Sequence, residues 1–529
     1  MPRDPRPRGG RIVGAARDWG VTGPSSTAAG VGLRSERGPV LAALMLTLSL
    51  VAIDGTVIAT AVPSIVNQIG GFSQFPWLFS AYLLTQAVTT PLYGRYADVV
   101  GRRPVLLLGI GLFVLGSLLC GLAWSMPVLI AARAVQGLGA GAVQPMVMTI
   151  VADMYTVQER SKVQGYVASV WGASAVIGPL FGGFVVQYVS WRWVFLVNLP
   201  LGLLAAVMIA RSFREKVERR EHRLDVLGAA LLVLACSLVI LGLLEGGVAW
   251  AWTGPAGVAV LGGGLVLLVL FVLVERRAPE PVLPLWVLSR RVLVAGNLSQ
   301  VGVGVMIVGL SSFVPTYVQN VLGTGPVVAG LAVGALTIGW PIAASQSGKV
   351  YLRIGFRDTA LIGSAVVLLG CCASAFWGAG TSVWWVAATC FVIGLGMGFA
   401  SAPVVVAVQS VVGWDQRGVV TSTNMFGRTV GSAVGAAVLG AVANATMLGR
   451  LGAAPPAVGP VPDDLDAATA LLVDGTGTDA LREVVRQALA VAMHHVFVGL
   501  VVVAAVIALG VAAMPRRTRT LDGEEVLEQ

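Results

Sequence analysis

The sequence predicts an all-α integral membrane protein. Of its 529 residues 56% are hydrophobic and 12% are charged, and the mean hydropathy is +0.84, far above the values of an ordinary soluble domain. Apolar runs of about 20 residues recur along the chain, which is the length that a helix needs to cross a bilayer. The runs are continuous and do not alternate with polar residues, so we expect helices and not a β-barrel.

The first 37 residues contain seven arginines and little apolar periodicity, so we predict a disordered cytoplasmic tail over 1–37. After this tail we predict fourteen transmembrane spans, and an even count places both chain ends on the same side of the membrane. The predicted spans are 38–58, 77–94, 104–124, 127–150, 163–188, 193–212, 225–245, 255–275, 293–317, 326–348, 358–378, 382–405, 419–445 and 491–513.

The lysines and arginines support this arrangement. With the N-terminus inside, 29 of the 35 fall in inside segments and four in outside segments, and Arg133 and Arg428 lie within spans. Positive charge is retained on the cytoplasmic side of membrane proteins. The distribution therefore predicts a multi-pass protein of the cell membrane with both termini cytoplasmic. It also explains the net charge of +9 without a nucleic-acid partner.

A short polar loop occurs twice in this apolar chain. GRYADVVGRRPVLLLG at 94–109 is echoed 254 residues later by GKVYLRIGFRDTALIG at 348–363, and GLGAGA at 137–142 is echoed by GLGMGF at 394–399. The echoes indicate two related halves, each with a hinge loop. The matched loop positions are Gly94 with Gly348, Gly101 with Gly355, and Arg103 with Arg357.

The loops follow the second and tenth spans, so we predict two six-helix halves with two helices inserted between them. Parallel repeats related by an axis along the membrane normal are typical of alternating-access transporters. We expect 446–490 to be a solvated outside connector, with a short amphipathic helix over Asp479–Met493 as the alternative. The predicted units are the tail 1–37, the N-terminal bundle 38–212, the insertion 213–290, the C-terminal bundle 291–513 and a cytoplasmic tail 514–529.

Five sequence blocks carry a family resemblance. In order they are AIDGTVIATAVPSI (52–65), GRYADVVGRRP (94–104), LIAARAVQGLGAGAVQP (129–145), GASAVIGPLFGGF (172–184) and WRWVFLVNLPLG (191–202). The chain resembles the major facilitator superfamily, and within it the fourteen-span drug:proton antiporter family. The resemblance implies a major facilitator fold with 6+2+6 helices, pseudo-twofold halves and transport driven by a proton gradient without a cofactor.

Asp54 is the candidate proton-coupling residue. A carboxylate within the hydrocarbon region is costly unless it is protonated or paired, so it is a functional candidate by default. Arg133 is the only cation in the fourth predicted span and lies at a similar depth. We expect the two side chains to pair and to separate when Asp54 takes up a proton. The alternatives are a helix-end cap for Asp54 and a static salt bridge between the two helices.

The loop after the second span is the candidate cytoplasmic gate. Its carboxylate and guanidinium groups can form a latch across the cytoplasmic mouth, and its glycines allow close approach and a tight turn. The alternative role of the arginines is to fix the membrane topology. The gate residues are Gly94, Asp98, Gly101, Arg102 and Arg103.

The fourth block corresponds to the antiporter motif of the family. Gly178 and Gly182 form a GxxxG pair, Gly183 follows, and Pro179 removes a helix hydrogen bond. We expect a helix that seals and opens the outer half of the molecule, with plain helix packing as the alternative.

Further residues are candidates for the substrate cavity or for a second ionisable site. Arg428 lies inside a span, where it lines a cavity or pairs with a carboxylate. Glu245 ends the seventh span, where an exposed helix end is the favoured interpretation over a second proton or cation site. The remaining cavity candidates are Trp171, Trp340, Asn424 and Phe426.

Together these features predict a proton-coupled exporter of amphipathic, often cationic small molecules that acts as a monomer in the lipid bilayer. The alternatives are a dedicated exporter of one antibiotic, lipid or other metabolite, and a non-transporting membrane sensor. An ATP-driven pump is not indicated, because Gly348-Lys349 lacks the glycine that a P-loop has five residues earlier. Clustered catalytic groups and C-x-x-C motifs are absent from the sequence, so neither an enzyme nor a metal site is expected.

Overall fold

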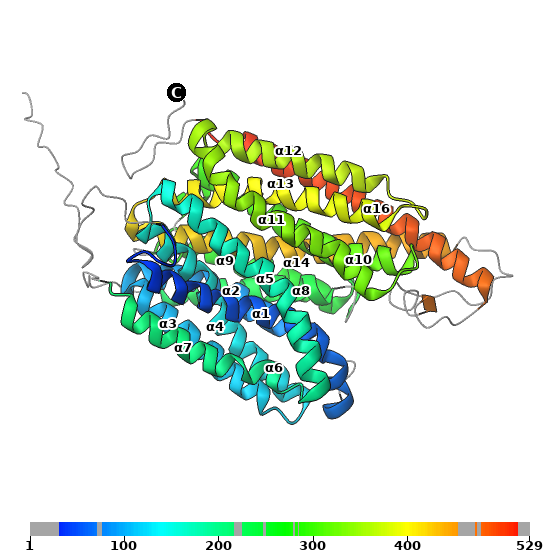
Figure 1. Cartoon of the computed structure of the whole chain (residues 1–529), viewed down its shortest axis with the longest axis horizontal. Coiled ribbons are helices and arrows are strands. Elements are labelled where there is room, and N and C mark those ends of the chain that lie inside the picture. Colours follow the sequence, from blue (N-terminus) through cyan, green and yellow to red (C-terminus); the bar gives the residue numbers. More distant parts are fainter. Residues whose placement is uncertain are drawn as a thin grey trace, which may run out of the picture.

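The computed structural model describes residues 31–70, 77–215, 225–246, 250–278, 281–283, 285–452, 471–472 and 478–516. In this described part the regular elements are helices, apart from a single isolated bridge between Gly246 and Trp250. The helices run along the long axis of the molecule in two bundles, with the N-terminal half below and the C-terminal half above in Figure 1.

The N-terminal half contains the first six predicted spans. The sixth span is divided at Val197, where the backbone stays helical but Pro200 has no N–H to donate to the carbonyl of Leu196. The helices are α1 (Gly38–Ile69), α2 (Trp77–Val100), α3 (Arg102–Gly121), α4 (Met126–Met154), α5 (Val157–Tyr188), α6 (Trp193–Leu196) and α7 (Asn198–Ser212).

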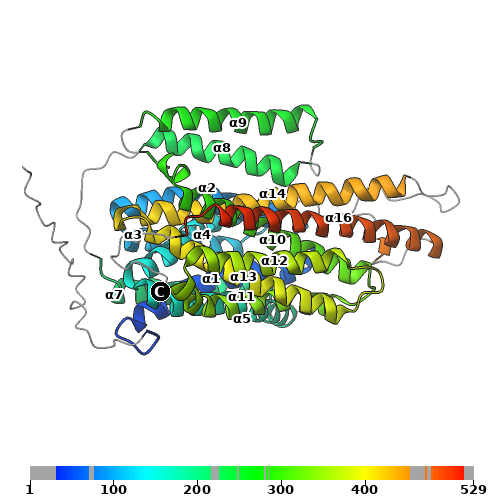
Figure 2. The same cartoon turned by 90° about the horizontal axis from the view of Figure 1, so that it is seen from above.

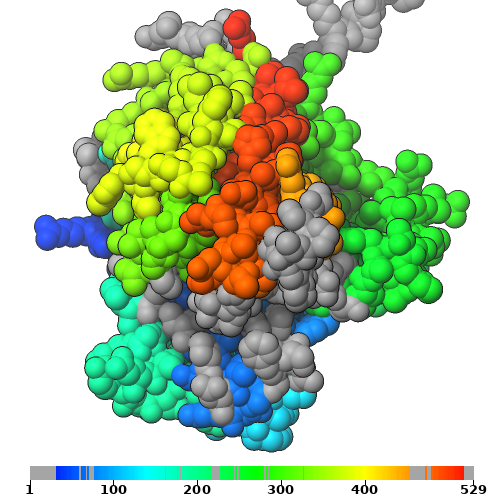
Figure 3. All heavy atoms as spheres, turned by 90° about the vertical axis from the view of Figure 1, so that its right-hand side faces the viewer, coloured from blue at the N-terminus to red at the C-terminus, as the bar shows by residue number. Residues whose placement is uncertain are grey.

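The two inserted helices form a hairpin on one side of the molecule. They are α8 (Val226–Glu245) and α9 (Pro255–Glu275). α8 packs on α2 and α14, and α9 packs on α8, so the hairpin lies beside the interface between the halves (Figure 2). The end-on view shows it as a separate ridge next to the two bundles (Figure 3). Its exposed apolar side chains, such as Leu265 and Val269, are suited to lipid contact.

The C-terminal half repeats the arrangement of the first half. A short 3-10 helix, η2 (Leu285–Leu288), leads into it, and another, η3 (Trp414–Gln416), precedes α14. The long helices are α10 (Arg291–Asn320), α11 (Pro326–Ile354), α12 (Phe356–Ala375), α13 (Val383–Ser410), α14 (Arg417–Leu451) and α16 (Asp479–Ala512).

The two halves share one packing pattern. α3 packs on α4, α2 on α4 and α1 on α5 in the first half, as α12 packs on α13, α11 on α13 and α10 on α14 in the second. The contacts between the halves follow the same symmetry, with α2 on α14 and α5 on α11. This is the pseudo-twofold arrangement that the repeated loops predict.

The glycine repeats explain how the helices come so close. A Cβ added to Gly139 would lie 2.5 Å from the carbonyl oxygen of Gly109, and a Cβ added to Gly396 would lie 2.9 Å from that of Gly363. Small residues let helix backbones approach in a membrane. The same glycine-mediated crossing of α3 with α4 therefore recurs between α12 and α13, 254 to 257 residues later.

Each of the fourteen predicted spans coincides with a helix, to within a few residues at most ends. Within the described chain, eleven helices are long and apolar enough to cross a membrane, with α6 and α7 counted as one. α2, α5 and α8 are not among the eleven. α2 and α5 carry polar groups at the interface between the halves, and the count of fourteen spans stays a prediction.

Two predicted boundaries are wrong. α1 continues eleven residues beyond 58, because Ala61 and Ile65 extend its buried face. Residues 479–490, expected to be a connector, form the first turns of α16, in which Leu481 and Val485 are buried and the Thr478 side chain caps the helix. The rest of the predicted loop from 453 to 477, except for 471–472, lies outside the described residues, as do tail residues 1–30 and 517–529.

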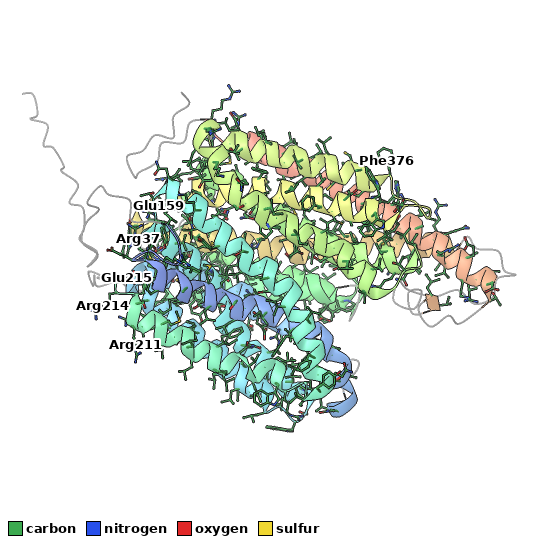
Figure 4. All side chains as sticks on the ribbon, viewed as in Figure 1. Arg37, Glu159, Arg211, Arg214, Glu215 and Phe376 are labelled. Atoms are coloured by element: carbon green, nitrogen blue, oxygen red, sulfur yellow. The ribbon has the colours of Figure 1, made fainter. Side chains whose placement is uncertain are left out.

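Charged side chains gather at one end of the bundle. Arg37, Glu159, Arg211, Arg214 and Glu215 lie together there, whereas Phe376 lies toward the opposite end (Figure 4). α1 begins and α16 ends at the charged end. We call this the inner end, after its predicted orientation, and the opposite end the outer end.

Candidate functional site

The Asp54 carboxylate and the Arg133 guanidinium form a buried ion pair between α1 and α4. Arg133 Nη1 donates to Asp54 Oδ2 at 2.7 Å, and each side chain is 1% exposed. The predicted pairing is therefore present in the structure. The helix-end cap proposed as the alternative for Asp54 is wrong, because α1 continues for fifteen residues beyond it, to Ile69.

Neutral polar groups complete the surroundings of the Asp54 carboxylate. Gln136 Nε2 donates to Asp54 Oδ1 at 2.8 Å and also to Ser117 Oγ of α3 at 2.8 Å. Asn198 Nδ2, at the start of α7, donates to the same Asp54 oxygen at 3.4 Å. The Asp54 carboxylate of α1 is thus bonded to α4 and α7 directly and connected to Ser117 of α3 through Gln136 and Asn198.

Arg133 would remain held if Asp54 became protonated. Its Nε donates to the backbone oxygen of Leu78 at 3.1 Å, and its Nη1 also donates to Gln136 Oε1 at 2.6 Å. Its guanidinium lies over the Tyr82 ring, 4.1 Å from the centroid, a favourable cation–π geometry. The arrangement can therefore exchange the charge of Asp54 without leaving the arginine uncoordinated.

The sequence interpretation did not include Gln136, Ser117 or Asn198. Gln136 could have been predicted, because it lies three residues after Arg133 and residues at this spacing share a helix face. Ser117 and Asn198 come from other helices, and their approach to Asp54 depends on how the helices pack.

The antiporter motif packs against α1 close to Asp54. A Cβ at Gly178 would lie 2.0 Å from Thr56 Oγ1, and that hydroxyl donates to the Ser174 backbone oxygen at 3.1 Å. Gly182 is buried, whereas a Cβ at Gly183 would have no atom within 4 Å. α5 is helical throughout the motif; the side chain of Pro179 lies outside the described residues.

At the inner end, Asp98 joins the two halves. Its carboxylate accepts the backbone N–H groups of Gly418 at 2.9 Å and of Val419 at 2.8 Å, at the start of α14. A helix N-terminus has free N–H groups and the positive end of the helix dipole, so it binds a carboxylate well. Asp98 of the N-terminal half is therefore latched to α14 of the C-terminal half.

Arg102 organises the same contact. Its side chain is fully buried and pairs with Asp98 at 3.0 Å and with Asp153 at 3.1 Å. It also donates to the Trp414 backbone oxygen, and its guanidinium lies 3.7 Å from the centre of the Trp414 ring. Arg103 points elsewhere, and its side chain donates to the backbone oxygen of Ala210.

Three further charged groups surround this latch. Arg417 Nη1 pairs with Asp153 Oδ1 at 3.2 Å and so adds an ion pair between the halves. Arg160, fully buried, lies 3.5 Å from Ser410 Oγ of α13. Glu215 Oε2 accepts the backbone N–H of Arg102 at 2.7 Å. Burial raises the pKa of the Glu215 carboxyl, against the opposing effect of the backbone N–H groups and the Arg102 charge.

Glycines allow this close approach. A Cβ at Gly94 would lie 2.2 Å from Ser422 Oγ, so α2 and α14 touch there. Gly101 has φ of 101°, a left-handed conformation that permits α3 to begin with only this one residue between it and α2. Gly355 has φ of 88° and makes the same turn between α11 and α12.

The echo loop reproduces the turn but not the pair of Asp98 with Arg102. Leu352 and Phe356 occupy the positions of Asp98 and Arg102. The corresponding contact uses Tyr351, whose hydroxyl donates to the backbone oxygen of Val157 at 3.3 Å. The ionic part of the latch therefore centres on the gate loop of the N-terminal half.

Midway along the bundle, Arg428 of α14 reaches the N-terminal half. Its Nη2 donates to Gln144 Oε1 of α4 at 2.8 Å. The carboxylate partner considered for Arg428 is therefore not present in the described part of the chain, where its partner is this amide. One turn further inward, Met148 and Met425 lie in one apolar cluster that also contains Leu48 and Val167 and so joins the halves.

The remaining cavity candidates divide into two groups. Trp171 packs on the cluster with Met425, and Trp340 packs on a cluster of Ala168, Ala344 and Ala402. Both clusters contain residues of the two halves. Asn424 does not line open space, because it is fully buried and hydrogen-bonded to Gln300 at 3.1 Å. Phe426 packs with α2 and the inserted hairpin, away from this central contact.

Glu245 ends α8 as predicted, but the expectation of an exposed helix end is wrong. Its side chain is only 6% exposed, near the foot of the hairpin turn where Trp252 packs over Gly246. In the described part of the chain, no group of three or more His, Cys, Asp or Glu side chains is placed to hold a metal ion.

The chain matches known proteins over most of its length. Residues 44–436 match the family model described as "Major Facilitator Superfamily". The "Multidrug transporter protein MdtP" of Bacillus subtilis (strain 168) is 33% identical over 416 residues, covering 78% of this chain and 76% of the relative. "Multidrug resistance protein 3" of the same organism is 31% identical over 403 residues, covering 76% and 79%.

A solved structure shares the fold. The crystal structure of the human organic anion transporter MFSD10 (TETRAN) superposes with a TM-score of 0.57, covering 89% of this chain and 99% of that one. Its sequence identity to this chain is 15%, so the likeness concerns the fold alone.

Proposed function

The chain belongs to the Major Facilitator Superfamily, and from that premise we propose that it is a proton-coupled exporter of amphipathic small molecules. It is a multi-pass membrane transporter. The finer proposal adds three elements, which are the coupling ion, the direction of transport and the substrate class.

The buried pair of Asp54 with Arg133 carries the proposal of proton coupling. A carboxylate at this depth is retained at a cost unless it is paired or has a functional role. The Asp54 carboxylate accepts hydrogen bonds from three side chains of two helices, and its arginine partner has other acceptors. Protonation can thus change the charge at one point in the bundle while the surrounding helices stay connected.

The inner latch supports alternating access. Asp98, Arg102 and Arg417 bind the two halves together at the inner end, so opening toward the inner side, where an exporter takes up its substrate, requires these contacts to break. Gly178 packs on Thr56, two residues after Asp54. Protonation of Asp54 can therefore affect the packing of α1 against α5 in the outer part of the N-terminal half.

The substrate class is proposed from the relatives and from the central contact. Two relatives are named for multidrug transport or resistance. Trp171, Met148 and Met425 provide aromatic and thioether surface where the halves meet, and such groups adapt to varied apolar ligands. We place the protein in the cell membrane with its inner end in the cytoplasm.

Everted membrane vesicles from a pump-deficient bacterial host test this function. A proton gradient is formed, and its dissipation is followed by a pH-sensitive dye when ethidium or another amphipathic compound is added. We expect substrate-induced proton release only in vesicles that contain the transporter. Export that persists after the gradient is collapsed, or that occurs without proton movement, would rule out the proposed coupling.

A further inference from the structure

In the described part of the chain, Arg428 has no carboxylate as a partner, in contrast to three other arginines of the bundle. Arg102, Arg133 and Arg417 each pair with a carboxylate within 3.2 Å. Arg428 is held by the neutral amide of Gln144 instead. A guanidinium has five N–H donors, and a charge inside a membrane is costly without a partner of opposite sign.

Arg428 lies at the depth in the membrane at which transporters of this architecture bind their substrates. It lies eleven residues after Arg417, which at 1.5 Å per residue places it about 16 Å from the inner end of α14. Gln144 lies ten residues before Met154, about 15 Å from the inner end of α4. Half of a hydrocarbon core of about 30 Å is the same depth, and substrate sites lie near the midplane between the repeats.

The surroundings of Arg428 join this charge to apolar surface. Met425 and Arg428 are three residues apart on α14, and Gln144 and Met148 are four apart on α4, so each pair shares a helix face. Met148 and Met425 belong to one buried apolar cluster with Leu48 and Val167, and Trp171 packs against this cluster. The Arg428 side chain is only partly buried although it lies midway along the bundle.

The hydrogen bond between Arg428 and Gln144 connects the two halves, so it must break when the halves separate. A ligand anion can then replace the amide. Because a guanidinium binds a carboxylate through two parallel, charge-assisted hydrogen bonds, an anionic ligand gains more than a neutral one at this point.

We propose that Arg428 and Gln144 form the polar end of the substrate site, and that the site takes amphipathic molecules with a carboxylate or similar anionic group. The apolar part of the ligand contacts Met148, Met425 and Trp171. This inference rests on the proposed exporter function and narrows its amphipathic substrates to those with an anionic group.

Binding of a matched pair of probes tests the inference. The probes are 1-pyrenebutyrate, a carboxylate at pH 7.5, and its neutral analogue 1-pyrenebutanamide. Binding to the purified full-length protein is measured by energy transfer from its tryptophans to pyrene. We expect the carboxylate to bind about tenfold more tightly than the amide, from the charge-assisted contact. A ratio near one in the wild-type protein overturns the inference.

Variants assign the preference to the site. Arg428→Gln should bring the affinity ratio close to one, and Arg428→Lys should retain part of it, because lysine keeps the charge but not the planar fork. Gln144→Glu should also abolish the preference, because it supplies the missing carboxylate within the protein and leaves Arg428 in place. This variant decides the question even if Arg428→Gln does not fold.

The control is Arg450→Gln, an exposed arginine at the outer end of the same helix, which should retain the wild-type ratio. An Arg428→Gln or Gln144→Glu protein that still prefers the carboxylate overturns the inference. The binding assay uses no proton gradient. A failure here therefore leaves coupled export intact, and a failure of coupled export in vesicles leaves the measured preference intact.

Discussion

The Asp98 carboxylate lies at the N-terminus of α14, where its Oδ1 accepts the Gly418 N–H at 2.9 Å. A Cβ at Gly418 would lie 2.5 Å from the same oxygen, so the carboxylate fills the space that the glycine leaves. This contact joins residues 320 positions apart and closes the inner end of the molecule.

Replacing Asp98 with alanine should open the inner end more often and slow transport. Two hydrogen bonds to a charged acceptor are lost, each worth about 1.5–3 kcal/mol, so we expect turnover to fall by about tenfold or more. Labelling of Ser422→Cys, which is buried behind Gly94, by a membrane-impermeant maleimide should rise from the inner side. Asp415→Asn, an exposed change in the neighbouring turn, is the control. Equal labelling in the Asp98→Ala and control proteins would contradict the latch.

Replacing Asp54 with asparagine should abolish proton coupling. It should also destabilise the protein by about 3 kcal/mol, because a buried arginine loses its partner charge. The double variant Asp54→Asn with Arg133→Gln removes both charges and should regain much of this stability without regaining coupling. Thermal unfolding and substrate-induced proton release provide the two readouts. Coupled transport by the double variant would favour a static salt bridge instead.

The α3–α4 contact positions Gln136, so it should be sensitive at Gly116. A Cβ there would lie 2.4 Å from the Gln136 backbone nitrogen, and Gly116→Val must push the helices apart at a cost of about 1–3 kcal/mol. We expect a lower unfolding temperature and impaired coupling, since Gln136 is a ligand of Asp54. Gly111→Val on the same helix, where a Cβ meets no atom within 4 Å, should change neither quantity. If both variants lost stability and coupling, the effect would come from valine within α3 in general and not from the α3–α4 contact at Gly116.

A cross-link between α5 and α11 should lock the two halves together. A Cβ at Gly165 would lie 2.9 Å from the Ser345 Cβ, so a small shift brings two cysteines to the usual disulfide separation of about 3.8 Å. In a protein whose five native cysteines are replaced, Gly165→Cys with Ser345→Cys should lose transport on oxidation and recover it on reduction. The single variants should be insensitive to oxidant. Transport by the oxidised double variant would exclude separation of the halves at this point.

The fold was predictable because its signals are local. Apolar runs of span length, the charge distribution and repeats such as 94–109 with 348–363 identify membrane helices and their duplication. The ends of α1 and α16 were not predictable from hydropathy, because both helices extend beyond the apolar run through residues such as Ile65 and Val485. These extensions are stabilised by neighbouring helices.

The site was predictable where residue type alone is informative. A carboxylate inside a membrane span singled out Asp54, and a lone arginine singled out Arg133. The amide of Gln144 has no such signal, since an uncharged side chain in an apolar run is not unusual. Its importance follows from its contact with Arg428, which belongs to the other half of the molecule.

The sequence by itself determined that the chain is helical and membrane-bound, which end carries the positive charge, and that the gate loop is duplicated. These properties depend on composition, period and spacing along the chain. The tertiary structure alone decided that Asp98 latches α14, that Asp54 is shared by four helices, and that Arg428 faces an amide and not a carboxylate. Such contacts join residues tens to hundreds of positions apart, and they depend on which helix faces meet, which in turn is set by where glycines let two backbones approach.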